Sequence, residues 1–106
     1  MSKIEKNGLE SKKQPALYQL HCLIKGRVQG VGFRYFVLDE AENRDLLGWV
    51  RNTECGEVEA VLLGPKTSLE SMLSVLHQGP PLSRVVRVDF EWEEPDPSLK
   101  GFNIRP

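Results

Sequence analysis

A glycine-rich segment, Gly26-Arg27-Val28-Gln29-Gly30-Val31-Gly32-Phe33-Arg34, separates a stretch of alternating apolar residues from a stretch with helical periodicity. Glycine lets the backbone turn sharply and leaves its N–H groups uncovered by side chains. These N–H groups converge on the start of a helix, where unsatisfied donors and the positive end of the helix dipole favour an anion. Arg34 falls in the first turn, and its planar guanidinium suits a phosphate or carboxylate. The segment therefore predicts an anion site, although a tight turn followed by a surface arginine would give the same pattern.

The rest of the chain alternates between strand and helix patterns. Period-two alternation of apolar residues predicts strands, and apolar residues three and four apart predict helices. In chain order we expect strand 17–25, helix 33–44, strands 46–52 and 57–63, a helix capped by Thr67 and ended by Gly79, strand 86–93, and a short strand in 101–105. The order β-α-β-β-α-β with an extra terminal strand indicates an α+β fold, a ferredoxin-like two-layer sandwich with a mostly antiparallel sheet.

Some positions carry more specific expectations. Thr67 and Glu70 have the spacing of a capping box, which predicts that Thr67 is the N-cap of the second helix. Gly56 can supply the positive φ that a short hairpin loop requires. Gln19 and His21 fall on the polar face of the first strand.

Length and composition fit one small domain. The chain has 106 residues, of which 40% are hydrophobic, and residues 1–15 are mostly charged and polar. We therefore expect a flexible tail over 1–15 and one folded domain over 16–106. With 14 basic and 15 acidic residues the net charge is −1, which argues against a nucleic-acid or anionic-membrane binder. Nothing resembles a secretory signal or an apolar run of about 20 residues. We interpret the two cysteines as free thiols, which are typical of the reducing cytoplasm, and we therefore expect a cytoplasmic location.

The chemistry open to the anion site is limited by what surrounds it in the sequence. No Ser/His or Cys/His pair stands near the glycine segment, so an activated nucleophile is not indicated. The two histidines lie on separate elements, and we expect neither a metal site nor a cofactor. What remains is displacement by water at an anion, driven by positioning and charge stabilisation. Asn52, which ends a predicted strand, offers an amide for this purpose.

The segment GRVQGVGFR, together with GWVRN at Gly48 to Asn52, resembles the acylphosphatase family, and the likeness runs from about Leu17 to Arg105. The resemblance implies a sandwich with both helices on one face of the sheet. It implies hydrolysis of acyl phosphates to a carboxylate and inorganic phosphate, without metal, cofactor or covalent intermediate. Relatives often have glycine where this chain has Asp45, at the end of the first helix, where a left-handed backbone is expected.

The resemblance also assigns the site. It implies that Arg34 and Asn52 are catalytic, with Asn52 orienting the water. The residues implied to bind substrate are Gln29, Gly30, Val31, Gly32, Phe33 and Arg34. An acyl phosphate substrate and its phosphate product are then the only partners expected, and a monomer is the default for a small enzyme with one site.

Three alternatives stay open at this point. A non-catalytic anion-binding regulatory module would need Arg34 and the glycine segment but not Asn52, so Asn52 favours the enzyme. An RNA-binding ferredoxin-like domain would need exposed aromatic residues on its sheet and a basic surface, and the chain offers only Trp49 and a slightly acidic balance. A unit cut from a larger maturation enzyme is disfavoured because the chain ends directly after its last predicted strand.

Overall fold

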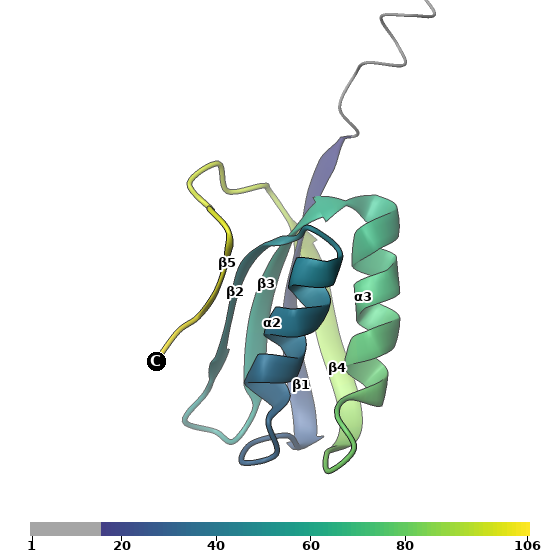
Figure 1. Cartoon of the computed structure of the whole chain (residues 1–106), viewed down its shortest axis with the longest axis vertical. Coiled ribbons are helices and arrows are strands. Elements are labelled where there is room, and N and C mark those ends of the chain that lie inside the picture. The colour runs from purple at the N-terminus through teal and green to yellow at the C-terminus, as the bar shows by residue number, and fades with distance from the viewer. Residues whose placement is uncertain (1–15) are drawn as a thin grey trace, which may run out of the picture.

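The computed structural model describes residues 16–106, which form a sheet covered by helices on one face (Figure 1). The tail expected over 1–15 lies outside the described residues. The elements are β1 (Leu17–Arg27), α2 (Phe33–Asn43), β2 (Leu47–Asn52), β3 (Val58–Pro65), α3 (Lys66–Gln78), β4 (Arg84–Glu93) and β5 (Phe102–Ile104). Each predicted helix and strand is present, with ends that differ by a few residues. No helix in 16–106 is long and apolar enough to cross a membrane.

The five strands of the sheet lie in the order β4-β1-β3-β2-β5. Strand β1 is antiparallel to both β3 and β4, and β2 is antiparallel to β3. Only β5 adds a parallel pairing, alongside β2. The predicted α+β ferredoxin-like sandwich, with a mostly antiparallel sheet and a short terminal strand, is therefore confirmed.

The core lies between the sheet and its two helices. On β1, the alternate residues Leu20, Cys22 and Ile24 are fully buried, as the period-two pattern predicts. The two helices cover them with residues at helical spacing, namely Phe33, Val37 and Ala41 from α2 and Leu69, Met72 and Leu76 from α3. Both helices thus pack on the same face of the sheet.

The opposite face of the sheet is partly covered by the chain itself. The segment after β4 runs from one edge of the sheet to β5 at the other (Figure 1). Along this path the backbone N–H of Asp96 donates to Gln19 Oε1 at 2.7 Å, while Gln19 Nε2 donates to Glu93 at 2.5 Å. Gln19 is consequently only 5% exposed. Its placement on the polar face of β1 was right, but this side chain is buried, and its nitrogen and oxygen each form a hydrogen bond.

The start of α3 differs from the prediction. The N-cap is Pro65, no side chain caps this helix, and the first helical residue is Lys66. Because β3 runs through Pro65 directly into the helix, Thr67 already has helical backbone and cannot act as the cap. The predicted capping box of Thr67 and Glu70 is therefore wrong, whereas the end of the helix at Gly79 is confirmed.

Strand β4 is confirmed, but its apolar row is less buried than its alternation suggests. Val88 is 7% exposed, whereas Val86, Phe90 and Trp92 are 74%, 47% and 42% exposed. β4 is one of the two edge strands of the sheet, and its pairing with β1 is shifted between Lys25 and Gly26. An edge position with such a bulge leaves side chains that α3 covers only in part.

Candidate functional site

The glycine-rich segment lies at one end of the sheet, beside two other connections. Residues 28–32 link β1 to α2, residues 53–57 link β2 to β3, and residues 79–83 link α3 to β4, all at the lower end in Figure 1. Gly79 adjoins the first residue of α2, since a Cβ at Gly79 would lie 2.9 Å from Phe33 Cε2. The predicted anion loop is thus surrounded by connections rather than isolated on the surface.

Two glycines give the loop its shape. Gly30 and Gly32 have φ of 73° and 79°, the left-handed region that other residues rarely adopt. A Cβ would meet no atom within 4 Å at either position, so the backbone conformation and not space requires glycine. Gly32 is the N-cap of α2, and no side chain caps that helix end. The N–H groups of the first turn therefore remain directed out of the helix, as an anion site needs.

Arg34 stands in the first turn of α2 with a half-buried side chain. The ion pairs formed within residues 16–106 all involve other cations, so no described carboxylate lies within 4 Å of its guanidinium. A half-buried arginine without an internal counter-ion keeps its charge and its donors available for a ligand.

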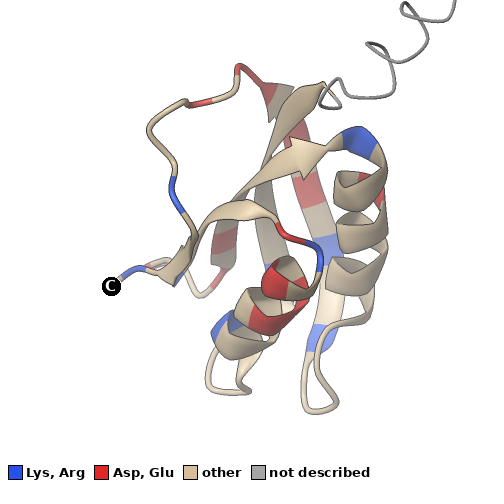
Figure 2. Cartoon of the chain, turned by 45° about the horizontal axis from the view of Figure 1, so that its top comes forward, with Lys and Arg blue, Asp and Glu red and all other residues tan. Residues whose placement is uncertain are grey.

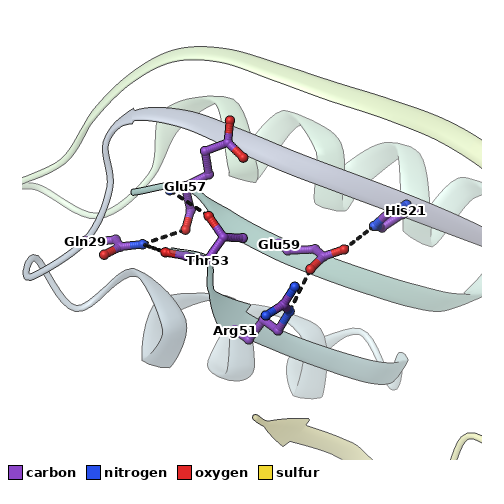
Figure 3. A network of polar contacts seen from close by, with 6 residues as sticks. All are labelled: His21, Gln29, Arg51, Thr53, Glu57 and Glu59. Atoms are coloured by element: carbon purple, nitrogen blue, oxygen red, sulfur yellow. Dashed lines mark hydrogen bonds and ion pairs between the residues drawn. The ribbon is translucent and has the colours of Figure 1, made fainter. Parts of the chain in front are cut away.

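Gln29 joins the loop to the β2–β3 hairpin. Its Nε2 donates to the carbonyl oxygens of Thr53 and Glu57, each at 2.8 Å (Figure 3). Within the hairpin, Thr53 N–H donates to the Glu57 carbonyl at 2.9 Å, and Thr53 Oγ1 accepts from Glu57 N–H at 3.1 Å. The Gln29 side-chain nitrogen is therefore committed to the protein, so this side-chain donor is not available to an anion.

Asn52 is the last residue of β2, directly before Thr53. It lies two residues beyond the fully buried Val50, and alternation along a strand therefore places both on the helix-covered side of the sheet. Its side chain is half-buried. Because β1 and β2 are both antiparallel to β3, the glycine loop after β1 and Asn52 at the end of β2 lie at the same end of the domain, where Gln29 bonds to Thr53. Sequence reasoning missed Thr53 and Glu57 as anchors, since both act through backbone carbonyls, which no residue type reveals.

A second polar network occupies the opposite face of the sheet. His21 Nε2 lies 2.6 Å from Glu59 Oε2, and Arg51 Nε donates to Glu59 Oε1 at 2.7 Å (Figure 3). Burial alone would raise the pKa of the Glu59 carboxyl, but hydrogen bonds from His21 and Arg51 and the nearby charge outweigh burial and lower the pKa. This network does not belong to the anion loop, because His21 and Arg51 alternate with the buried residues of their strands.

Three side chains that could hold a metal ion come together in the fold, although the sequence gives no sign of this grouping. Donor atoms of His21, Glu91 and Glu93 lie within 4.8 Å of one another. Pairing of β1 with β4 sets His21 opposite Glu91, although 70 positions separate the two in sequence. This group is on the face away from Asn52, so it is not a part of the anion site.

Trp49 does not provide an open RNA-stacking surface. Its side chain is half-buried, and the guanidinium carbon of Arg105 lies 4.5 Å from the centre of its ring. Arg105 thus covers a ring that stacking with a base would require to be free. The two cysteines are free, as expected, with Cys22 buried and Cys55 exposed.

Comparison with known proteins agrees with this geometry. The family model described as acylphosphatase matches residues 20–104. The acylphosphatase of Thermococcus kodakarensis is 50% identical over 84 residues, which cover 79% of this chain and 91% of that protein. The acylphosphatase of Trichormus variabilis is 45% identical over 95 residues, which cover 90% of this chain and 93% of that protein. The crystal structure of acylphosphatase from Bacillus subtilis superposes with a TM-score of 0.81 at 38% identity, covering 86% of this chain and 100% of that one.

Proposed function

Because this chain belongs to the acylphosphatase family and hydrolyses acyl phosphates, we propose that Arg34 and the amides of the glycine loop bind the phosphoryl group and that Asn52 orients the attacking water. Membership of a family of hydrolases disfavours the alternative that the sequence left open, a non-catalytic anion-binding regulatory module. The reaction breaks the bond between phosphorus and the bridging oxygen, releasing a carboxylate and inorganic phosphate.

The phosphoryl group binds at the start of α2. Backbone N–H groups from Gly30 to Phe33 donate to its oxygens, and the Arg34 guanidinium neutralises part of its charge. Positive φ at Gly30 and Gly32 supports this arrangement, because it exposes successive N–H groups on one side of the loop. These donors also stabilise the charge that develops on the phosphoryl oxygens in the transition state.

The attacking water is held by the side-chain amide of Asn52. Water attacks phosphorus in line with the departing carboxylate, whose oxygen takes the bonding electron pair. The water proton passes to an oxygen of the substrate's own phosphate, so no strong general base and no covalent intermediate are needed. A carboxylate is a good leaving group, and positioning together with charge stabilisation therefore suffices.

The observation that carries the proposal is the double hydrogen bond of Gln29 to the hairpin carbonyls of Thr53 and Glu57. It fixes the loop that presents Arg34 against the hairpin that follows Asn52. The two hydrogen bonds join these elements before substrate arrives, which lowers the entropic cost of aligning water and phosphate.

The test is hydrolysis of benzoyl phosphate with a chelator present, for the wild type, Asn52→Ala and a control, Asn103→Ala. Asn103 is exposed on β5 and its side chain bonds only to the backbone of Lys100 among the described residues. Asn52→Ala should lower kcat about 100- to 1000-fold while inorganic phosphate inhibits as before. Asn103→Ala should match the wild type. Full turnover by Asn52→Ala would refute the role of Asn52.

A further inference from the structure

A group of metal-ligand side chains stands on the face of the sheet that carries no helix. His21 of β1 lies opposite Glu91 of β4, and Glu93 is the next residue of β4 on the same side. The donor atoms of the three lie within 4.8 Å of one another. An imidazole with two carboxylates, leaving further positions to water, is a donor set that zinc accepts in proteins. We propose that His21, Glu91 and Glu93 bind one Zn²⁺ ion.

The histidine is already oriented for such a role. Its Nε2 is 2.6 Å from Glu59 Oε2, and since a carboxylate only accepts, Nε2 carries the hydrogen. Glu59 is held in turn by Arg51 at 2.7 Å. The other ring nitrogen, Nδ1, forms no hydrogen bond within residues 16–106, so in the neutral imidazole its lone pair is the one that a metal would take. A histidine that donates its second N–H to a carboxylate is the usual arrangement at protein metal sites.

One of the carboxylates is oriented as well. Glu93 accepts a hydrogen bond from Gln19 Nε2 at 2.5 Å, and Gln19 is fixed because it is 5% exposed and also accepts from the backbone of Asp96. Glu91 is exposed and free to close on a cation. Beside His21 and Glu91 the surface is hollowed, with a volume of ≈ 190 Å³ that also touches Leu23 and Asp89. This hollow provides room for the water ligands of a three-residue site.

Local charge also favours a divalent cation. The end of β4 and the segment after it carry Glu91, Glu93, Glu94 and Asp96. Figure 2 shows red bands along this part of the chain. Glu91 and Glu93 form no ion pair with any cation of residues 16–106, and Arg51 pairs with Glu59 instead. Two unpaired carboxylates repel each other, and one Zn²⁺ would balance both charges. The nitrogen ligand favours Zn²⁺ over Mg²⁺ or Ca²⁺, which prefer oxygen donors.

Zn²⁺ bound at this group would stabilise the folded chain and would not act in catalysis. His21 and Glu91 come together only when β1 and β4 pair, so Zn²⁺ binds the folded chain and joins the edge strand to its neighbour. The site is on the face of the sheet opposite Asn52, so an ion bound there would not contact the acyl phosphate.

The test is calorimetric titration of the full chain with ZnCl₂ in a phosphate-free buffer, together with thermal unfolding with and without the metal. The chain has two histidines and two cysteines, so the exposed thiol is removed by Cys55→Ser in every variant. We expect binding of one Zn²⁺ per chain and a higher Tm with the metal. His21→Ala and Glu91→Gln should each weaken binding by tenfold or more, and Glu59→Gln by about 10- to 100-fold. In each of these three variants, addition of Zn²⁺ should no longer raise the Tm.

Two matched controls separate a built site from general attraction to acidic surface. His77→Ala removes the other imidazole, which is exposed on α3, and Glu94→Gln removes a neighbouring carboxylate outside the group. Both should bind Zn²⁺ as the parent does. Absence of saturable binding would overturn the proposal. So would unchanged affinity in His21→Ala and Glu91→Gln, or binding of Mg²⁺ as tight as that of Zn²⁺.

Discussion

The side-chain nitrogen of Gln29 donates a hydrogen bond to the carbonyl oxygen of Thr53 at 2.8 Å, across 24 positions of sequence. Gln29 belongs to the glycine loop, and Thr53 directly follows Asn52 at the start of the hairpin. Within the loop, Val28 is buried in the core and Val31 packs against it, whereas Gln29 is the residue that bonds to the hairpin. The Gln29 side chain therefore links the proposed phosphate site directly to the hairpin beside the proposed water site.

Replacing Gln29 should reduce activity by loosening that connection. In Gln29→Ala the carbonyls of Thr53 and Glu57 lose a donor, which should lower the free energy of unfolding by about 1–2 kcal/mol. Turnover should fall about 10- to 100-fold, because small misplacements of reacting groups are costly. Urea denaturation and steady-state kinetics measure the two effects, with Gln78→Ala, at the exposed end of α3, as the control. Wild-type kinetics in Gln29→Ala would show that the loop is fixed by other contacts.

Arg34 should be required for both phosphate binding and turnover. Removing its charge in Arg34→Ala should lower kcat about 100- to 1000-fold and weaken competitive inhibition by inorganic phosphate. Arg34→Lys should restore the charge but only part of the activity, since an ammonium lacks the bidentate fork. Arg44→Ala is the matched control, because it removes a cation next to the far end of the same helix, where Arg44 pairs with Glu40 at 2.6 Å. If phosphate inhibited Arg34→Ala as strongly as the wild type, the phosphate-binding role would be wrong.

The parts of the fold that depend on local signals could be predicted from the sequence. Gly30 and Gly32 mark the turn into α2 because their backbone conformation is one that other residues avoid. Leu69, Met72 and Leu76 mark the buried side of α3 because helix periodicity is intrinsic to the backbone. The residues of the glycine loop and Asn52 were likewise named in advance, although their chemical roles rest on resemblance and stay predictions.

The parts that depend on contacts between distant segments could not be predicted. Burial of Gln19 arises only because the chain after β4 crosses the sheet and presents the N–H of Asp96. The grouping of His21 with Glu91 requires knowledge of which strand neighbours β1. Thr67 failed as an N-cap because β3 continues through Pro65 into the helix, a junction that capping statistics do not anticipate. In each case the tertiary arrangement decided a property that the local sequence left open.

The end of α2 offers a stabilising substitution. Asp45 has φ of 56°, and the N–H groups of Leu46 and Asp45 donate to the carbonyls of Ala41 and Glu42 at 2.9 and 3.1 Å. This is a Schellman arrangement, in which glycine normally holds the left-handed position. Asp45→Gly should raise the free energy of unfolding by about 0.5–1 kcal/mol because glycine removes the Cβ strain. Asp45→Ala should lower it, since alanine keeps the Cβ and lacks a polar group for local hydrogen bonding. Urea denaturation at neutral pH measures both, and a destabilised Asp45→Gly would contradict the account.

The two thiols should differ sharply in reactivity. Cys22 is fully buried on β1, and this burial, with a smaller contribution from the charge of Glu93, raises the pKa of its thiol to about 12. Because the thiolate is the nucleophile, Cys22 should be inert at pH 8 in the folded protein, whereas the exposed Cys55 should react at once. Titration with a disulfide reagent should release one equivalent rapidly and the second only after denaturation. Cys55→Ser should abolish the rapid release and leave only the equivalent that appears after denaturation. Two rapid equivalents from the folded wild type would mean that β1 opens far more readily than its burial implies.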